Sequence, residues 1–186
     1  MKSIKTILIF GASGSGSTTL AKAVEQQFGY HFIDTDDAIW EDTDPPFSVR
    51  KPFETSLRYV QTAMNGHETN VISGSFIGWG EPLKEQVDLY VYMHLPVDVR
   101  LERIQKREIN RFGKRVLLGG DLYLQHLDFL DWVSRYEETD ETHRGQKQHL
   151  KWLEDVKRPI VRITQPMSIE ELLAKLAPFL NEEVDA

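Results

Sequence analysis

A glycine-rich loop near the start of the chain carries the residue types that bind phosphate. It follows an apolar run that ends at Phe10, and its glycines are Gly11, Gly14 and Gly16. The spacing fits the pattern G-x-x-x-x-G-K-[ST], with Ser17 at the lysine position and Thr18 after it. Such glycines let backbone N–H groups surround phosphate oxygens, and the N-terminus of the following helix adds partial positive charge. We therefore expect a nucleotide-phosphate site, although a plain Gly/Ser turn has a similar composition.

The loop residues have individual expected roles. Those expected to contact nucleotide phosphates are Gly11, Ala12, Ser13, Gly14, Ser15, Gly16, Ser17, Thr18 and Thr19. Thr18 would also offer its hydroxyl to Mg²⁺. The missing lysine would normally reach the β- and γ-phosphates as a point charge. Ser17 leaves that charge to another residue. Lys22 lies too far along the first helix, whereas an arginine from a lid could supply it.

Three carboxylates follow the second apolar run within four residues. They are Asp34, Asp36 and Asp37. Carboxylates this close repel one another unless a cation or a donor-rich ligand lies between them. Beside a phosphate loop, Mg²⁺ with its waters and a substrate hydroxyl would meet that need, so we expect Asp34 and Asp36 to be functional. The alternative is an acidic helix N-terminus that runs on to Trp40, and we assign capping to Asp37.

Small residues follow the third apolar run. Gly74 and Ser75 would let a ligand approach the backbone closely, so both are expected to contribute to the substrate site. Phe76 and Trp79 lie in the same loop, and we expect them to fill the core.

Arginines recur every three or four residues along one predicted helix. They are Arg100, Arg103, Arg107 and Arg111. Like charges at this spacing destabilise a helix by about 0.2–0.5 kcal/mol per pair. Either an anionic ligand or carboxylates from elsewhere in this acidic chain must therefore compensate. We expect Arg100 or Arg103 to have a structural role.

The basic residues beyond the middle of that helix are expected to be catalytic. They are Arg107, Arg111 and Arg115. Glycines bound the segment that follows the helix, at Gly113 and at positions 119 and 120. A glycine-hinged loop with arginines is typical of a phosphoryl-transfer lid, which we place at about residues 107–122.

Short apolar runs alternate with helical patterns along the whole chain. Strands are predicted at residues 4–10, 30–33, 70–73, 89–95 and 159–164, and helices at residues 18–28, 53–64, 96–111, 121–138, 143–156 and 168–180. Ser168 and Glu171 form a capping box at the start of the last helix. This alternation predicts one three-layer α/β domain over residues 1–186, with ligands beyond the carboxyl ends of parallel strands.

Composition limits the possible partners. The chain has 186 residues, 40% of them hydrophobic, no cysteine and a formal net charge of −7. An acidic balance argues against binding a nucleic-acid polymer, and no apolar stretch reaches the length of a membrane span. Without a signal sequence or cysteines, we expect a cytoplasmic monomer or homodimer that does not bind membranes. The six histidines show no metal-ligand spacing and are expected to be structural or surface residues.

Together these motifs resemble the small P-loop kinases, which include nucleoside monophosphate kinases, shikimate kinase and gluconate kinase. The resemblance rests on the loop at 11–19, the sequence Asp34-Thr35-Asp36, the third loop, and the sequence Arg-Phe-Gly-x-Arg at 111–115. In motif style the chain is most similar to bacterial adenylate-kinase-related proteins without the loop lysine. The resemblance implies a five-stranded parallel sheet in the order 2-3-1-4-5, with ATP and Mg²⁺ as cofactors.

The resemblance also implies individual roles. As in shikimate kinase, Asp34 would lie near Mg²⁺, acting through water, and Asp36 would bind a substrate hydroxyl. Arg50 and Arg58 match the basic residues that hold the anionic group of the substrate. The expected activity is ATP-dependent phosphoryl transfer to a small acceptor, a nucleoside monophosphate first of all. A hydroxyl kinase of the shikimate or gluconate type and a non-catalytic nucleotide sensor are the alternatives.

Overall fold

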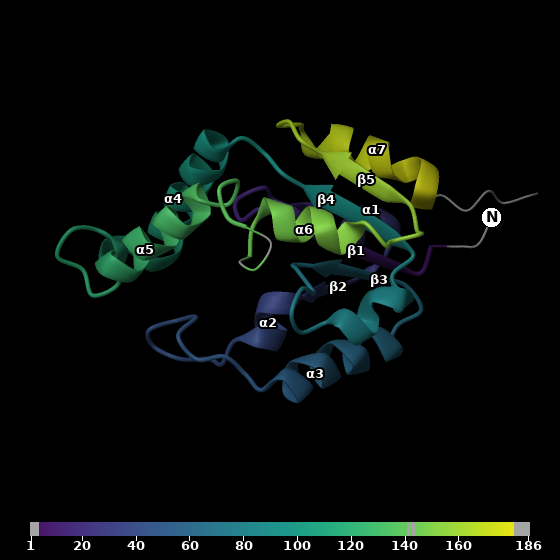
Figure 1. The fold of residues 1–186 in the computed structure, drawn as a ribbon, viewed down its shortest axis with the longest axis horizontal. Helices are drawn as coiled ribbons and strands as arrows, with labels where there is room; N and C mark the ends of the chain where they lie inside the picture. The colour runs from purple at the N-terminus through teal and green to yellow at the C-terminus, as the bar shows by residue number, and fades with distance from the viewer. Residues whose placement is uncertain (1–3, 141, 143, 181–186) are drawn as a thin grey trace, which may run out of the picture. The chain divides into compact units, whose positions relative to one another are not determined.

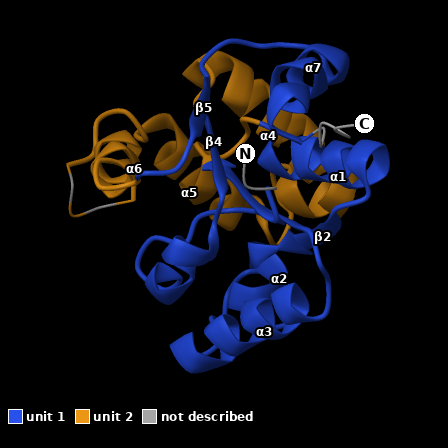
Figure 2. Ribbon diagram, turned by 90° about the vertical axis from the view of Figure 1, so that its right-hand side faces the viewer, with its two compact units in different colours: residues 1–10, 16–93, 157–186 blue, residues 11–15, 94–156 orange. Residues whose placement is uncertain are grey.

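The computed structural model describes residues 4–140, 142 and 144–180 (Figure 1). These residues fall into two compact units. The first unit comprises the described parts of residues 1–10, 16–93 and 157–186, and the second comprises those of 11–15 and 94–156 (Figure 2). The whole segment expected to form a lid, about 107–122, belongs to the second unit. A single domain over residues 1–186 stays a prediction.

Apart from Gly11 at the end of β1, the sheet lies in the first unit, and it has the predicted order. Its strands are β1 (Thr6–Gly11), β2 (His31–Asp34), β3 (Asn70–Ser73), β4 (Leu89–Met93) and β5 (Ile160–Ile163), arranged β2-β3-β1-β4-β5. The pairs β1–β3, β2–β3 and β4–β5 are parallel. Each strand overlaps its predicted range. Strand β1 is apolar from Ile7 to Phe10, as is typical of a central strand in a parallel sheet, and Ile7, Leu8 and Ile9 are fully buried.

Helices of the first unit flank this sheet. They are α1 (Ser17–Phe28), α2 (Thr35–Ile39), α3 (Phe53–Asn65) and α7 (Ile169–Leu180), with a 3₁₀ helix η1 (Glu81–Gln86). Helix α1 packs against β2, β3 and α7, and α2 packs against α3. The predicted capping box is confirmed, because the Glu171 N–H donates to Ser168 Oγ at 3.2 Å and the Ser168 N–H donates to Glu171 Oε2 at 2.7 Å.

Where the structure describes the second unit, its regular elements after residue 93 are helices. They are α4 (Val97–Phe112), a 3₁₀ helix η2 (Gly113–Val116), α5 (Tyr123–Ser134) and α6 (Gln146–Leu153). Helices α5 and α6 are shorter than predicted, and the predicted start of α6 at His143 lies outside the described residues. Within the described part of the chain, no helix is long and apolar enough to span a bilayer.

Candidate functional site

The glycine loop has the backbone conformation that its glycines predict. Gly11, Gly14 and Gly16 have φ angles of 148°, 84° and 97°, which side chains rarely allow. Gly16 precedes the first residue of α1, and no side chain caps this helix. The N–H groups of its first turn can therefore point toward the oxygens of an anion.

Residues 11–15 of this loop are fixed by the start of α4, in the same unit. Ser15 is 2% exposed; its Oγ accepts a hydrogen bond from the Leu95 N–H at 3.3 Å, and its carbonyl oxygen accepts one from Arg103 Nη1 at 3.3 Å. Gly14 lies against the backbone of Arg100, and a Cβ atom there would come within 2.7 Å of the Arg100 carbonyl oxygen. The conformation of residues 11–15 thus depends on the helix that follows β4.

Oxygen-bearing side chains lie at the carboxyl ends of β2 and β3 and at the start of α1. Thr18 Oγ1 and Ser73 Oγ share a hydrogen bond of 2.9 Å, and Asp34 is the register partner of Ser73 on the neighbouring strand. Hydroxyls and carboxylates are the hard oxygen ligands that Mg²⁺ prefers, so this donor set fits the expected ion. The sequence analysis did not assign Ser73. The only signal for it was a small polar residue at the end of a buried strand.

Asp34 also begins the following helix. Its Oδ1 accepts a hydrogen bond from the Asp36 N–H at 3.0 Å and so caps α2. The assignment of this cap to Asp37 was therefore wrong, because α2 starts at Thr35, directly after Asp34. Asp36 and Asp37 occupy the first turn, where negative charge is favourable, and their side chains are exposed.

The pKa of Asp34 is raised to about 6. Burial of the carboxyl is the main cause, and the charges of Asp36 and Asp37 add to it, while the Asp36 N–H and Lys22 act in the opposite direction. Asp34 therefore changes its protonation state close to neutral pH. A perturbed carboxyl at the mouth of a parallel sheet is typical of a functional site.

The third loop is compact. Gly74 has a φ angle of 113°, and a Cβ atom there would come 1.8 Å from Thr35 Oγ1, so Thr35 already occupies the space beside it. Ser75 is buried, and its carbonyl oxygen accepts the indole N–H of Trp79 at 2.8 Å. Phe76 and Trp79 pack edge to face in the core, as predicted, with ring centroids 5.5 Å apart. The substrate roles expected for Gly74 and Ser75 stay predictions.

Arg50, which was expected to hold the anionic group of the substrate, lies in the segment between α2 and α3 and next to the Trp40 side chain. A bridge pairs Trp40 with Arg50, whose guanidinium lies 5.5 Å from the Trp40 ring centroid. Phe47 packs edge-on against the same indole at 6.1 Å. Arg58 is exposed on α3. Trp40 and Phe47 were not recognised from sequence as part of this arrangement.

Of the arginines on α4, Arg100 is structural, as expected. It is fully buried, its Nε donates to the Leu95 carbonyl oxygen at 2.8 Å and its Nη1 to that of Val133 at 3.2 Å. Its Nη2 forms an ion pair with Glu137, which also contacts His94 at 2.7 Å. The sequence analysis expected either an anionic ligand or a carboxylate from elsewhere in the chain to compensate these arginines. For Arg100 it is a carboxylate, that of Glu137.

The lid arginines contact their own unit. Arg107 pairs with Glu108 at 2.9 Å, and Arg115 pairs with Asp121 at 2.6 Å. The Arg111 guanidinium lies 5.2 Å from the centroid of the Phe112 ring. Their catalytic role stays a prediction. Binding a phosphate would require Arg107 and Arg115 to exchange carboxylates for phosphate oxygens.

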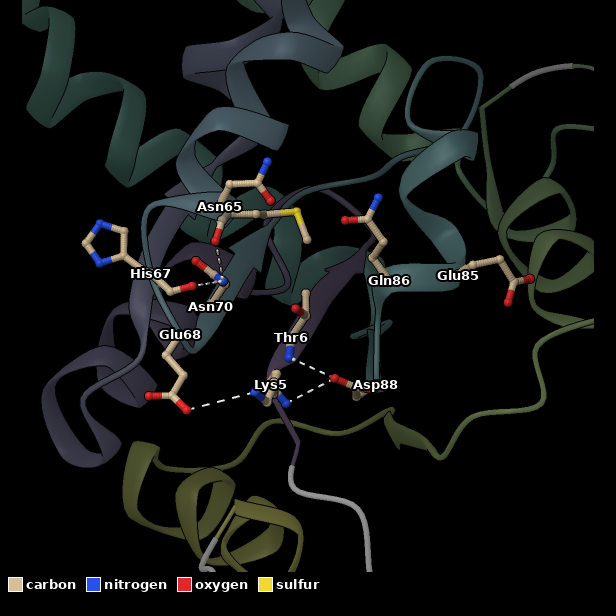
Figure 3. Close-up of a pocket in the computed structure, with 10 residues that line it drawn as sticks. Lys5, Thr6, Asn65, His67, Glu68, Asn70, Glu85, Gln86 and Asp88 are labelled. Atoms are coloured by element: carbon tan, nitrogen blue, oxygen red, sulfur yellow. Dashed lines mark hydrogen bonds and ion pairs between the residues drawn. The ribbon is translucent and has the colours of Figure 1, made fainter.

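A hollow of about 270 Å³ lies at the opposite, amino-terminal end of the sheet (Figure 3). Its polar side chains mostly tie the backbone together. Asp88 accepts the N–H groups of Lys5 and Thr6 at 3.0 and 3.2 Å, and the Asn70 amide donates to the carbonyl oxygens of Met64 and His67 at 3.2 and 3.3 Å. The hollow is therefore separate from the glycine loop. Its polar side chains have a structural role, because they hold neighbouring backbone segments together.

No group of three or more His, Asp or Glu side chains in the described part of the chain could hold a metal ion. His149 is fully buried, and burial lowers its pKa to about 3. A hydrogen bond of 2.5 Å joins Nδ1 of His149 to the Tyr136 hydroxyl. This histidine is structural, as expected.

The chain belongs to the AAA domain family, whose model matches residues 7–115. It is similar over nearly its whole length to an uncharacterized protein, YqaC, of Bacillus subtilis, with 33% identity over 95% of this chain and 98% of that one. A cytidylate kinase from Pyrococcus horikoshii is 26% identical over 55% of this chain and 57% of its own.

Solved structures show the same fold. Shikimate kinase from Acinetobacter baumannii, in complex with shikimate, superposes with a TM-score of 0.52 at 19% identity, over 98% of this chain and 96% of that one. The chain therefore shares the fold of this solved kinase structure, with a five-stranded sheet in the order 2-3-1-4-5. The sequence itself shows that the glycine loop lacks the lysine of the pattern, because Ser17 stands at the lysine position.

Proposed function

We propose that the protein is an ATP- and Mg²⁺-dependent kinase that phosphorylates a small molecule, a nucleoside monophosphate. The glycine loop carries this proposal, because three positive φ angles and an uncapped helix N-terminus form a cradle for phosphate oxygens. When bound, ATP supplies the transferred phosphoryl group and Mg²⁺ neutralises charge on its phosphates.

The residues of the chain would act mainly by positioning. The amides of residues 11–19 would hold the nucleotide phosphates. Thr18 would bind Mg²⁺ directly, and Asp34 would hold one of its waters, consistent with the oxygen cluster that Thr18 and Ser73 form beside Asp34. Asp36 would orient the acceptor. Arg107, Arg111 and Arg115 would neutralise charge that develops on the phosphoryl group.

A charged, planar acceptor fits the segment after α2. The Arg50 guanidinium lies 5.5 Å from the Trp40 ring centroid, and its N–H groups would bind a phosphate of the acceptor. Trp40 and Phe47 add aromatic surface of the kind on which a nucleobase stacks. Arg58 would assist from α3. The similarity to a cytidylate kinase agrees with a nucleotide acceptor.

One observation favours a second candidate, a hydroxyl kinase. The Asp34 pKa of about 6 lets the Asp34–Asp36 pair accept a proton near neutral pH. A hydroxyl acceptor would give up a proton on attacking the γ-phosphorus, whereas a monophosphate oxygen would not. Sugar acids and shikimate are therefore the acceptors to compare with nucleoside monophosphates.

The test is release of ADP from ATP and Mg²⁺ with each acceptor in turn. We expect release with nucleoside monophosphates, and a loss of about 10²-fold or more in Asp36→Asn, the range for a group that acts on the reacting atoms. Asp37→Asn is the matched control, because Asp37 is equally exposed on the same helix turn. Release with sugar acids or shikimate alone would favour the hydroxyl kinase. ATP binding without release for any acceptor would show a nucleotide sensor.

A further inference from the structure

The backbone of Leu95 connects the glycine loop to a side chain of α4. Leu95 follows β4, is 2% exposed and belongs to the second unit together with residues 11–15 of the loop. Its N–H donates to Ser15 Oγ at 3.3 Å, and its carbonyl oxygen accepts a hydrogen bond from Arg100 Nε at 2.8 Å. This buried residue therefore holds the loop with its N–H and is itself held by Arg100.

The guanidinium of Arg100 acts on Leu95 as a rigid group. It is fully buried and planar, so its three nitrogens are fixed relative to one another. A partner that holds one of these nitrogens also sets the position of Nε, and with it the Leu95 carbonyl oxygen. The Arg100 backbone packs on Gly14 as well, so the same residue contacts the loop directly.

Glu137 provides the charged partner of this guanidinium. Arg100 Nη2 forms an ion pair with Glu137 Oε1, while Nη1 donates to the Val133 carbonyl oxygen at 3.2 Å. Glu137 lies beyond the end of α5, and its Oε1 also contacts His94 Nε2 at 2.7 Å. Because hydrogen bonds between charged groups are the stronger ones, the carboxylate holds the orientation of Arg100 more firmly than the neutral carbonyl oxygens do.

We propose that Glu137 is a positioning residue for the glycine loop. It acts through Arg100 and the backbone of Leu95 on Ser15, and so keeps residues 11–15 in the conformation that binds phosphate. The carboxylate itself contacts no phosphate in this role. The proposal deepens the proposed function and rests on phosphate binding by the loop.

The first experiment measures hydrogen exchange by NMR without any ligand. A purely structural role for Glu137 would lower the free energy of unfolding and leave the loop of the folded protein unchanged. Glu137→Gln keeps the shape of the side chain and an acceptor oxygen but removes the charge. It should raise exchange of the Leu95 N–H about 10-fold, whereas exchange of Ile104, buried farther along α4, should rise less than about twofold. Glu138→Gln is the matched control, because Glu138 is the exposed neighbour of Glu137.

The second experiment measures binding of inorganic phosphate by calorimetry in Glu137→Gln, in Ser15→Ala and in the double variant. Ser15→Ala removes the Oγ atom that Leu95 holds but keeps the amide of the loop. Each single variant should weaken binding about 5- to 20-fold, because small displacements of a preorganised site are costly. The double variant should lose no more than about twofold beyond the weaker-binding single variant, since both substitutions break the same series of contacts. Urea unfolding at the assay temperature checks that each variant is folded.

Arg100→Lys tests the same series of contacts at its middle. A lysine keeps a cation for Glu137 but lacks the fork that also reaches the Leu95 carbonyl oxygen. It should therefore raise Leu95 exchange and weaken phosphate binding about as much as Glu137→Gln does. If Glu137→Gln does not fold, this variant decides the question.

Three outcomes would overturn the proposal. They are unchanged Leu95 exchange in Glu137→Gln, an equal effect in Glu138→Gln, and losses in phosphate binding that multiply in the double variant. Absence of phosphate binding in the unchanged protein would instead refute the proposed function. Leu95 exchange needs no ligand, so it would still decide whether Glu137 controls the conformation of residues 11–15.

Discussion

Gly14 lies so close to Arg100 that no side chain fits at position 14. A Cβ atom on Gly14 would come within 2.7 Å of the Arg100 carbonyl oxygen and within 3.0 Å of its Cα and Cβ atoms. Backbone atoms of a helix cannot move aside as the end of a flexible side chain can. The middle glycine of the loop is therefore required by packing against α4 as well as by its φ angle of 84°.

Gly14→Ala should destabilise the protein by about 2–5 kcal/mol. A left-handed conformation costs an ordinary residue about 1–2 kcal/mol, and overpacking adds about 1–3 kcal/mol. Gly119→Ala is the control, because Gly119 has a similar φ of 87° and no atom within 4 Å of an added Cβ. Urea unfolding measures both variants. Equal losses would show that the contact with Arg100 carries no cost.

Arg100→Met should cost about 3–5 kcal/mol in the free energy of unfolding. The substitution leaves Glu137 without its buried cation and removes the donors to the Leu95 and Val133 carbonyl oxygens. Arg135→Met should cost less than about 1 kcal/mol, since its pair with Asp131 is exposed. Denaturant unfolding of the two variants checks this difference, and similar values would contradict a buried, paired role for Arg100.

The pKa of Asp34 predicts a dependence of stability on pH. Its folded-state value of about 6 lies above the ordinary value of 3.8, so the folded protein holds a proton that the unfolded chain releases. The resulting stabilisation is present at low pH and is lost as pH rises from about 4 to about 6. Asp34→Asn should remove this loss and still cap α2, because asparagine is also a good N-cap.

The measurement is urea unfolding at pH 4.5 and pH 7.5 without Mg²⁺. Relative to the unchanged protein, Asp34→Asn should gain on the order of 1 kcal/mol more at the higher pH, a value discounted because the carboxyl is only partly buried. Asp37→Asn should show no such gain. A gain for Asp34→Asn that is the same at both pH values would mean that Asp34 titrates normally.

Much of the fold could be predicted from local patterns. Strand β3 was predicted at the residues where it lies, and the predicted start of α3 at residue 53 also agrees. Apolar runs of strand length and helical periodicity depend on neighbouring residues only, so the sequence shows them directly. The strand order came from resemblance, since no local signal states which strands are neighbours.

The site was predictable where its chemistry is local. The loop glycines and the acidic residues after β2 stand in continuous motifs. By contrast, Ser73 lies beside Asp34 only because of the parallel register of β2 and β3. Likewise, the space beside Gly74 is filled by Thr35, a residue of another segment. The partner of Arg100, Glu137, lies 37 residues away along the chain. Such contacts depend on tertiary packing, which one sequence does not specify locally.

His149 predicts a second pH effect, of opposite sign. Its pKa of about 3 lies below the ordinary 6.5, so the unfolded chain takes up a proton that the folded protein excludes. The stabilisation is therefore present above about pH 6.5 and is lost as pH falls toward 3. Between pH 7 and pH 5 this histidine should contribute a loss of up to about 2 kcal/mol, since each pH unit below 6.5 is worth about 1.4 kcal/mol.

Two variants separate this effect from other titrations. In His149→Phe, the free energy of unfolding should fall less between pH 7 and pH 5 than in the unchanged protein. Urea unfolding at the two pH values measures this difference. Tyr136→Phe should be destabilised by about 1–3 kcal/mol at pH 7, because it leaves His149 Nδ1 without the hydroxyl, but should keep the pH dependence. The same pH dependence in His149→Phe as in the unchanged protein would show that His149 is not the group responsible.

Arg115 forms an exposed ion pair with Asp121. The guanidinium donates to both carboxylate oxygens, with Nε at 3.0 and 3.1 Å and Nη2 at 2.6 Å, and this pairing lowers the pKa of Asp121. If Arg115 binds the transferred phosphoryl group, it must first leave this exposed ion pair, which is weak because solvent screens it. Asp121→Asn should therefore tighten ATP binding by roughly 1.5- to 5-fold.

Asp131→Asn, which releases Arg135 from an equivalent exposed pair, should leave ATP binding unchanged. Calorimetry with ATP distinguishes the two roles of Asp121, because weaker binding in Asp121→Asn would mean that the carboxylate holds Arg115 in position for the ligand and does not compete with it.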